Sequence, residues 1–267
     1  MRFHGSLVFT VQKGAFSVSN KVKMTQKIDF PTALEKLVPR AKAINHLPYL
    51  EFHKKRYLFL VQKVSDVLAK MEGRSPVRIL DVGPSFQTWI FEQIWPELEI
   101  DTFGFPDSKF PPAPGRSHFS YDLNDSIDQT TWPEVGPYDL IVMSEVIEHL
   151  YTAPKQVLAL LSSFLRPSGF LIVQTPNAVA LHCRLKMILG RNPYDMIQEE
   201  RTNPAHYREY TAKELSAMGR KVGLKPVDLE AANYFGARSM FSKINNALAP
   251  LLPSSLRKGI TITYQKA

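Results

Sequence analysis

Cysteine is nearly absent from this chain of 267 residues, because Cys183 is the only one. No intramolecular disulfide can form, so we expect the protein to work in a reducing compartment such as the cytoplasm. Long hydrophobic runs are also missing, since no segment approaches the roughly 18–20 apolar residues of a membrane-spanning helix. Residues 1–14 lack the apolar stretch and the small-residue cleavage site of a signal peptide, and we expect none there.

Acidic residues are absent from residues 1–28, which contain five basic ones: Arg2, Lys13, Lys21, Lys23 and Lys27. The apolar residues of this segment follow no sustained period, which predicts a flexible basic arm. The whole chain carries a formal net charge of +8. That charge allows contact with nucleic acid or with an anionic membrane surface, but by itself it identifies neither partner.

Short apolar strands separated by helical stretches make up most of the remaining sequence. Residues 77–82, 138–144 and 169–174 are apolar runs that end at polar residues or turns. Such runs predict a parallel α/β sheet, which binds its ligands at the carboxyl ends of the strands. We therefore divide the chain after the arm into a helical region, 29–74, and an α/β domain, 75–267, with an insertion at about 178–205.

Further elements follow from periodicity and capping signals. Apolar residues recur at helical spacing between His53 and Met71, and Gly73 is a natural stop. Thr211 followed by Glu214 is a capping-box pattern that predicts the start of a helix. Residues 226–234 and 260–264 are expected to form the last two strands, paired as an antiparallel hairpin.

Three motifs in order carry a family resemblance: Ser144 to Leu150 (SEVIEHL), Leu165 to Leu171 (LRPSGFL) and Thr175-Pro176-Asn177. Together with Asp81-Val82-Gly83 they resemble class I S-adenosylmethionine (SAM) methyltransferases, in particular those similar to the ubiquinone-biosynthesis O-methyltransferases. The resemblance implies a Rossmann-like sheet of seven strands, mostly parallel with the last strand antiparallel, and helices on both faces. It implies methyl transfer to an oxygen, or less readily to a nitrogen.

The resemblance also implies a SAM site, which we place on particular residues. Asp81 would accept from the ammonium group of SAM, directly or through water, and Gly83 would permit the tight turn. Asp107 would bind the ribose hydroxyls, Asp122 the adenine amino group, and Leu123 would pack on the ring. Pro84, Ser85 and Ser144 complete the predicted cofactor site. The chain departs from the family at Ser85 and Gln87, which stand at two glycine positions, and at Pro106, where the ribose acid often lies.

A cluster of acids and histidines suggests the catalytic groups. Glu145, Glu148 and His149 at i, i+3 and i+4 would share one face of a helix. With His206 they resemble the divalent-metal ligands of small-RNA 2′-O-methyltransferases, where an ion such as Mg²⁺ lies beside the acceptor hydroxyl. In the alternative, Glu145 orients SAM, Glu148 caps a backbone or pairs with Arg208, and His149 is a metal-free general base.

The acceptor is less defined. The sequence of residues 177–194 predicts a mostly apolar helix with interspersed basic residues. This helix would be either a substrate lid or an ordinary insertion. We expect a small-molecule, sugar or lipid-linked hydroxyl acceptor. Two alternatives remain: a metal-dependent RNA ribose 2′-O-methyltransferase, although no RNA-binding module is recognisable and nucleic acid is therefore disfavoured, and a non-catalytic SAM-binding protein. Residues 240–257 would form a membrane contact, a dimer face or a plain surface helix.

Overall fold

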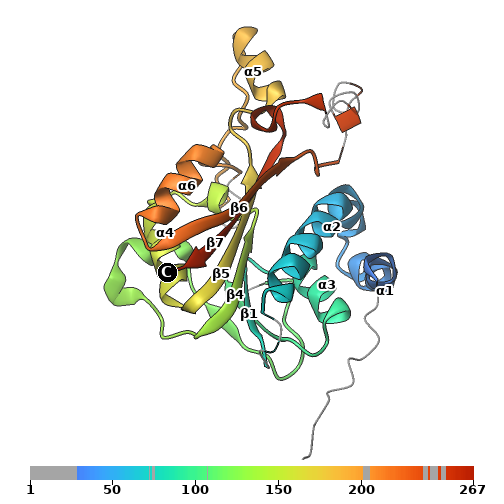
Figure 1. Cartoon of the computed structure of the whole chain (residues 1–267). Coiled ribbons are helices and arrows are strands. Elements are labelled where there is room, and N and C mark those ends of the chain that lie inside the picture. The colour runs from blue at the N-terminus through green and yellow to red at the C-terminus, as the bar shows by residue number, and fades with distance from the viewer. Residues whose placement is uncertain are drawn as a thin grey trace, which may run out of the picture.

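Figure 1 shows the computed structural model of the protein, which describes residues 29–71, 73, 76–106, 108–200, 205–236, 240, 246, 247 and 251–267. The predicted basic arm lies outside these residues, and so do residues 241–245 and 248–250 of the predicted 240–257 helix. The strands are β1 (Arg78–Val82), β2 (Glu99–Gly104), β3 (His118–Ser120), β4 (Tyr138–Ser144), β5 (Leu165–Pro176), β6 (Leu224–Ala232) and β7 (Gly259–Lys266). The helices are α1 (Phe30–Ala43), α2 (Leu47–Ala69), α3 (Phe86–Ile94), α4 (Pro154–Ser163), α5 (Leu181–Ile188) and α6 (Ala212–Arg220).

One seven-stranded sheet organises the molecule, in the order β3-β2-β1-β4-β5-β7-β6. The pairs β3–β2, β2–β1, β1–β4 and β4–β5 are parallel, whereas β7 runs antiparallel to both β5 and β6. The predicted sheet, with six strands in one direction and the last strand reversed, is confirmed. Strand β7 inserts between β5 and β6, so β6 forms the edge.

Helices cover both faces, which explains the continuous apolar strands. Helices α1, α2 and α3 lie on one face, and α4 and α6 on the other (Figure 1). Every residue of β4 is buried. Leu140 and Val142 belong to the core under the first group of helices, while Ile141 and Met143 belong to the core under the second. A strand that alternates between two cores has no polar face, as is typical of parallel sheets.

The predicted helical region consists of two helices. They are separated at Asn45, which adopts a left-handed backbone with φ +56°. The α2 helix is fastened across the molecule, because the Lys63 ammonium lies 2.8 Å from Asp228 and 2.7 Å from Glu230 of β6. Within the described part of the chain, no helix is long and apolar enough to cross a lipid bilayer.

The capping box at the start of α6 is confirmed. The Thr211 hydroxyl accepts from the Glu214 backbone N–H at 3.2 Å, and the Glu214 carboxylate accepts from the Thr211 backbone N–H at 2.9 Å. This reciprocal pair satisfies two of the helix's first N–H groups. The segment just before α6 holds His206, so the cap fixes where that segment ends.

Candidate active site

A cavity of about 790 Å³ opens where β1, β2, β3 and β4 end. Loops converge at this edge of a parallel sheet, which makes it the usual ligand site of such folds. The volume lies within the range of about 300–1,000 Å³ for small-molecule sites. Four of the predicted cofactor residues line the cavity: Gly83, Pro84, Asp122 and Leu123.

The turn after β1 shows why the chain departs from the glycine pattern. Gly83 has φ +71°, and a Cβ added there would lie 2.4 Å from Val146 Cγ2. The Gln87 side-chain amide donates to the Gly83 carbonyl at 3.2 Å. Ser85 Oγ lies 3.2 Å from the Tyr57 hydroxyl of α2. The two residues that replace glycines therefore connect the turn to its neighbours.

Asp81 lies beneath this turn with no exposed surface and does not line the cavity. The Thr88 hydroxyl donates to one carboxyl oxygen at 2.5 Å, and the Gln87 amide donates to the other at 3.4 Å. Burial raises the pKa of Asp81 to about 7, against the lowering effect of these hydrogen bonds. Asp81 thus anchors the start of α3, and its contact with the SAM ammonium group stays a prediction.

The ribose and adenine side of the cavity follows β2 and β3. Asp107, predicted for the ribose, lies outside the described residues, but its neighbour Pro106 lines the cavity. A side-chain oxygen of Asp122 accepts from the backbone N–H and the side-chain amide of Asn124, at 3.0 and 2.9 Å. Leu123 is 5% exposed beside it. The roles assigned to these three predicted residues remain predictions.

The segment after β4 corrects the expected helix. Glu145 has φ +56°, and only Ile147–His149 forms a short 3₁₀ turn, η3. The left-handed residue at 145 precedes the turn, so Glu145, Glu148 and His149 do not share one face of a helix as expected. Ser144 is buried and donates to the Gln174 side chain at 2.8 Å, so it faces the sheet and does not line the cavity.

Glu148, His149 and His206 lie close together. Each offers one ligand atom, and these atoms lie within 4.8 Å of one another. His149 Nδ1 donates to the Ala205 carbonyl at 2.7 Å, and His206 Nδ1 donates to Glu209 at 3.0 Å. Both rings therefore keep Nε2 available as an acceptor in the neutral form.

The third member of this group is the Glu148 carboxyl. One oxygen accepts from the Thr175 hydroxyl at 2.9 Å, while the other is buried without a hydrogen-bond partner in the described chain and lies 4.0 Å from His149 Nε2. The predicted pairing of Glu148 with Arg208 is not formed, because Arg208 binds Glu214 at 2.6 Å. An unpartnered buried oxygen beside two imidazoles is a costly arrangement unless a ligand occupies it.

The pKa values of His206 and Glu145 are both raised, but for different reasons. Burial lowers the pKa of His206, but the hydrogen bond to Glu209 and the charges of Glu148, Glu209 and Glu145 outweigh it and raise the pKa above its usual value. Burial and the charge of Glu148 raise the pKa of Glu145 to about 8. Glu145 lies outside the three-residue ligand group.

Arg56 of α2 is a site residue that the sequence analysis missed. The residue is 1% exposed, its guanidinium lies 3.8 Å from the Glu145 carboxylate, and its Nε has no partner among the residues described. Helical spacing places Arg56 on the same face as Leu60 and Val64, both buried. An arginine on the apolar face of a helix was the available signal, because buried charges need a paired role.

Comparison with known proteins decides the family. A family model described as "Methyltransferase domain" matches residues 52–229, about two thirds of the chain. The chain belongs to this methyltransferase family. A sequence search among curated proteins finds no match.

Two solved structures share the methyltransferase fold. One is the 1,6-didemethyltoxoflavin-N1-methyltransferase of Burkholderia thailandensis with bound S-adenosylhomocysteine, at 16% identity and TM-score 0.50, with 89% of each chain covered. The other is a SAM-dependent methyltransferase from Archaeoglobus fulgidus, at 16% identity and TM-score 0.51, with 82% of this chain and 100% of that chain covered. By family and fold, the protein is a class I SAM-dependent methyltransferase.

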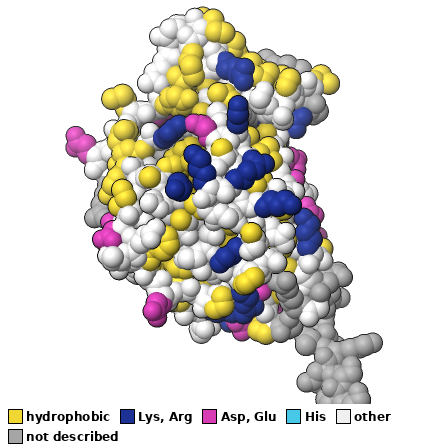
Figure 2. Space-filling model, turned by 60° about the vertical axis from the view of Figure 1, so that its left-hand side comes forward, with side chains coloured by type: hydrophobic (Ala, Val, Ile, Leu, Met, Phe, Trp, Pro, Cys, Tyr) yellow, Lys and Arg dark blue, Asp and Glu magenta, His cyan; other side chains and the backbone are white. Residues whose placement is uncertain are grey.

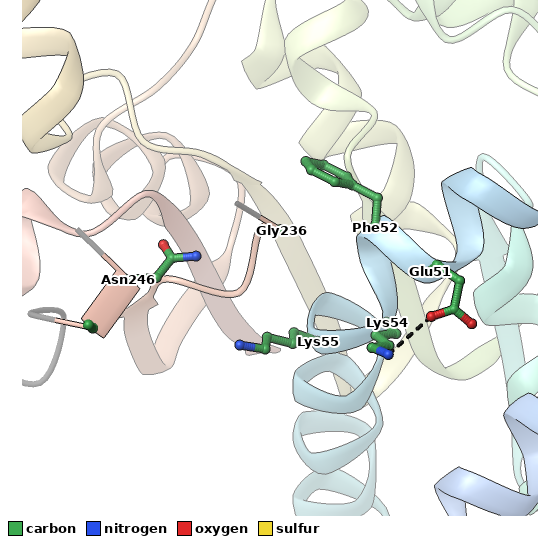
Figure 3. A pocket seen from close by; sticks show the side chains of 7 residues that line it. Glu51, Phe52, Lys54, Lys55, Gly236 and Asn246 are labelled. Carbon is green, nitrogen blue, oxygen red and sulfur yellow. Dashed lines mark hydrogen bonds and ion pairs between the residues drawn. The ribbon is translucent and has the colours of Figure 1, made fainter. Parts of the chain in front are cut away.

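A second hollow of about 620 Å³ lies between α2 and the segment after β6 in this methyltransferase (Figure 3). Lys54 at its border is paired with Glu51 at 3.0 Å, and Lys55 extends from α2 toward Asn246. The described lining contains no histidine and no second carboxylate. This hollow therefore offers fewer groups for acid–base or metal chemistry than the cavity at the strand ends, which His149 and Glu145 line.

The first prediction concerns Gly83. The Gly83→Ala methyltransferase should lose more stability than Gly223→Ala, although both glycines have left-handed backbones, because only the new Cβ at 83 collides with Val146. Backbone strain alone should cost each variant about 1 kcal/mol. Urea unfolding measures the difference, and Val146→Ala in the Gly83→Ala background should recover part of it. Equal losses for the two single variants would show that the turn tolerates a side chain.

Proposed function

We propose that this methyltransferase transfers the methyl group of SAM to a hydroxyl oxygen of a small-molecule, sugar or lipid-linked acceptor. The convergence of Glu148, His149 and His206, of which His149 lines the cavity, carries the proposal. A hydroxyl oxygen is a weak nucleophile unless its proton is removed as it attacks, whereas the lone pair of a neutral amine is nucleophilic without such help. A cluster of a carboxylate and two imidazoles, each of which offers Nε2 as an acceptor in its neutral form, suits an oxygen acceptor better than a nitrogen one.

The cavity lining fits SAM. Gly83 and Pro84 let the backbone approach the methionyl part, and Asp122 with Leu123 forms the predicted adenine end. We assign the ribose hydroxyls to Asp107. When bound, SAM supplies a methyl group that is carried on a positively charged sulfur. As the methyl group is transferred, the sulfur departs with the sulfur–carbon electron pair. The protein's own contribution is to hold the acceptor oxygen in line with that carbon.

The residues also fit a divalent metal ion. Each histidine donates its Nδ1–H to an oxygen, which is the support that metal-binding histidines usually have. The buried, unpartnered oxygen of Glu148 is a further ligand. Two imidazoles and one carboxylate favour a transition ion such as Mn²⁺ or Zn²⁺ over Mg²⁺, which prefers oxygen. A bound ion would lower the pKa of the acceptor hydroxyl.

The same geometry supports a second candidate mechanism without metal. His149 donates through Nδ1 to the Ala205 carbonyl at 2.7 Å, so Nε2 would take the acceptor proton. His149 lines the cavity, and His206 packs edge-on against it with ring centroids 4.8 Å apart. In this mechanism His149 is the general base, while Glu148 stabilises the imidazolium that forms.

The first experiments use the full chain and no acceptor. Isothermal titration with S-adenosylhomocysteine should show binding at one site, and a second titration with Mn²⁺, Zn²⁺ or Mg²⁺ should separate the two mechanisms. Transfer from SAM with a labelled methyl group is then measured on hydroxyl and amine acceptors, with and without chelator. The absence of S-adenosylhomocysteine binding would contradict the enzyme, and methylation of amines alone would contradict the oxygen acceptor.

A further inference from the structure

An apolar, basic tip follows the end of β5. We define the α5 tip as residues 184–197, from the second half of α5 through the turn that follows it. In Figure 1, α5 stands clear of the sheet and its covering helices. Ile188, Leu189 and Met196 are 79%, 71% and 78% exposed. Leu185, Met187 and Ile197 are exposed as well. Six exposed apolar side chains on one short segment form a patch of the kind that marks interaction sites.

The α5 tip is folded, so its exposure is not that of an unstructured loop. The Arg184 side chain donates to the Val179 carbonyl at 2.8 Å, and the Tyr194 hydroxyl donates to the Ala178 carbonyl at 3.0 Å. These bonds hold both ends of the tip against its base. The Lys186 ammonium donates to the Pro193 carbonyl at 3.1 Å and braces the turn. The apolar side chains are thus presented outward by a defined scaffold.

Charge decides what would cover the tip. Arg184, Lys186 and Arg191 are exposed, and none is paired with a carboxylate within the described part of the chain. Acidic side chains come only at the far end, at Asp195 and beyond the tip at Glu199 and Glu200. Figure 2 shows hydrophobic side chains at the upper end of the molecule, with Lys and Arg side chains among and below them.

A second copy of the chain is a poor occupant for this patch. A two-fold contact would bring two copies of the same basic patch together, and their repulsion would oppose the apolar contact. An anionic lipid bilayer offers both partners at once, since its headgroups attract Lys and Arg while its acyl boundary takes up apolar side chains.

We infer that the α5 tip docks on an anionic membrane surface. The chain that leads to the tip leaves the sheet where β5 ends, at Pro176. The parallel strand next to β5, β4, ends at the same edge of the sheet, and the cavity opens there. Docking would bring that edge to the lipid headgroups and would favour an amphiphilic or lipid-linked acceptor. Only this statement about the acceptor rests on the proposed function, because docking itself needs neither SAM nor methyl transfer.

The test is sedimentation of the full-length protein with sucrose-loaded vesicles. Phosphatidylcholine vesicles are compared with vesicles of equal parts phosphatidylcholine and phosphatidylglycerol. Binding should require the anionic lipid and should weaken as salt is raised. Ile188→Asp should reduce binding by about tenfold or more, since it removes an apolar side chain that would be buried in the bilayer and adds a negative charge. Ile127→Asp is the matched control, because Ile127 is also exposed, at 64%, but lies elsewhere.

A charge pair completes the test. Arg184→Glu with Lys186→Glu should weaken binding by about tenfold, whereas Lys36→Glu with Lys42→Glu on α1 should have little effect. Equal binding by the wild type and Ile188→Asp would overturn the inference and assign any vesicle contact to another basic segment. A wild-type dimer that Ile188→Asp converts to a monomer, as measured by light scattering, would also overturn it. S-adenosylhomocysteine binding should be the same in all these variants, so a failure of docking is distinguishable from a failure of the proposed function.

Discussion

Replacing His149 with alanine should lower the turnover for methyl transfer by about 10²–10⁴-fold, because the acceptor hydroxyl loses the group that assists its deprotonation. His149 lines the cavity, and its Nδ1–H is held by the Ala205 carbonyl at 2.7 Å. The ring is therefore fixed with Nε2 available. Turnover is measured with labelled SAM on the acceptor that the panel identifies.

Two comparisons make this prediction specific. The His149→Ala variant should keep the affinity of the wild type for S-adenosylhomocysteine in calorimetry, which separates chemistry from cofactor binding. His182→Ala is the control, since His182 at the start of α5 belongs to no ligand group in the described chain. If His149→Ala turned over at the wild-type rate while binding the cofactor, His149 would have no part in the reaction.

Removing one ligand of the proposed metal group should have the second large effect. His206→Ala should reduce the affinity for Mn²⁺ or Zn²⁺ strongly. The loss should exceed the roughly 10–100-fold that is expected when the supporting partner of a ligand, here Glu209, is replaced. The pKa of His206 is raised, and the proton must leave before the ring can bind an ion. Metal affinity should therefore be full above the raised pKa and should fall by about tenfold per pH unit below it.

Glu209→Gln sharpens this prediction. Glutamine can still accept the hydrogen bond from His206 Nδ1 but removes the negative charge that raises the pKa of His206. The pH at which metal binding is half lost should move down, while affinity at high pH falls by about 10–100-fold. Glu51→Gln, which only breaks a surface pair with Lys54, should change neither. If the wild type bound no divalent ion at pH 8, the metal proposal would be wrong and His149 would remain as a metal-free base.

Much of the candidate site could be located from the sequence, because the relevant residues follow strands. Parallel strands end at a common edge, so the turns at Gly83, at Asp122 and at Glu145 had to meet there once the sheet was recognised. Local patterns behaved similarly. The capping box at Thr211 depends on residues three positions apart, and its geometry follows from neighbours alone.

The roles of individual side chains could not be predicted in the same way, because they depend on distant contacts. Asp81 and Ser144 lie at the correct strand ends, yet both point into the protein, where Thr88 and Gln174 bind them. The helix expected from Glu145 to His149 is instead a bend at Glu145 followed by a short 3₁₀ turn, since a left-handed residue at 145 interrupts the spacing. Periodicity describes continuous elements and is blind to a single residue with φ above zero.

The sequence by itself predicted a mostly parallel sheet from its apolar runs and turn residues, because these are local properties, and the resemblance of its motifs to a family implied the seven strands and the cofactor edge. Only the tertiary structure decided which groups face one another. His206 reaches His149 although 56 residues separate them, and Arg56 reaches Glu145 from a helix on one face of the sheet. Those contacts depend on how the buried strands and helices pack, and packing energy comes from residues far apart in the chain.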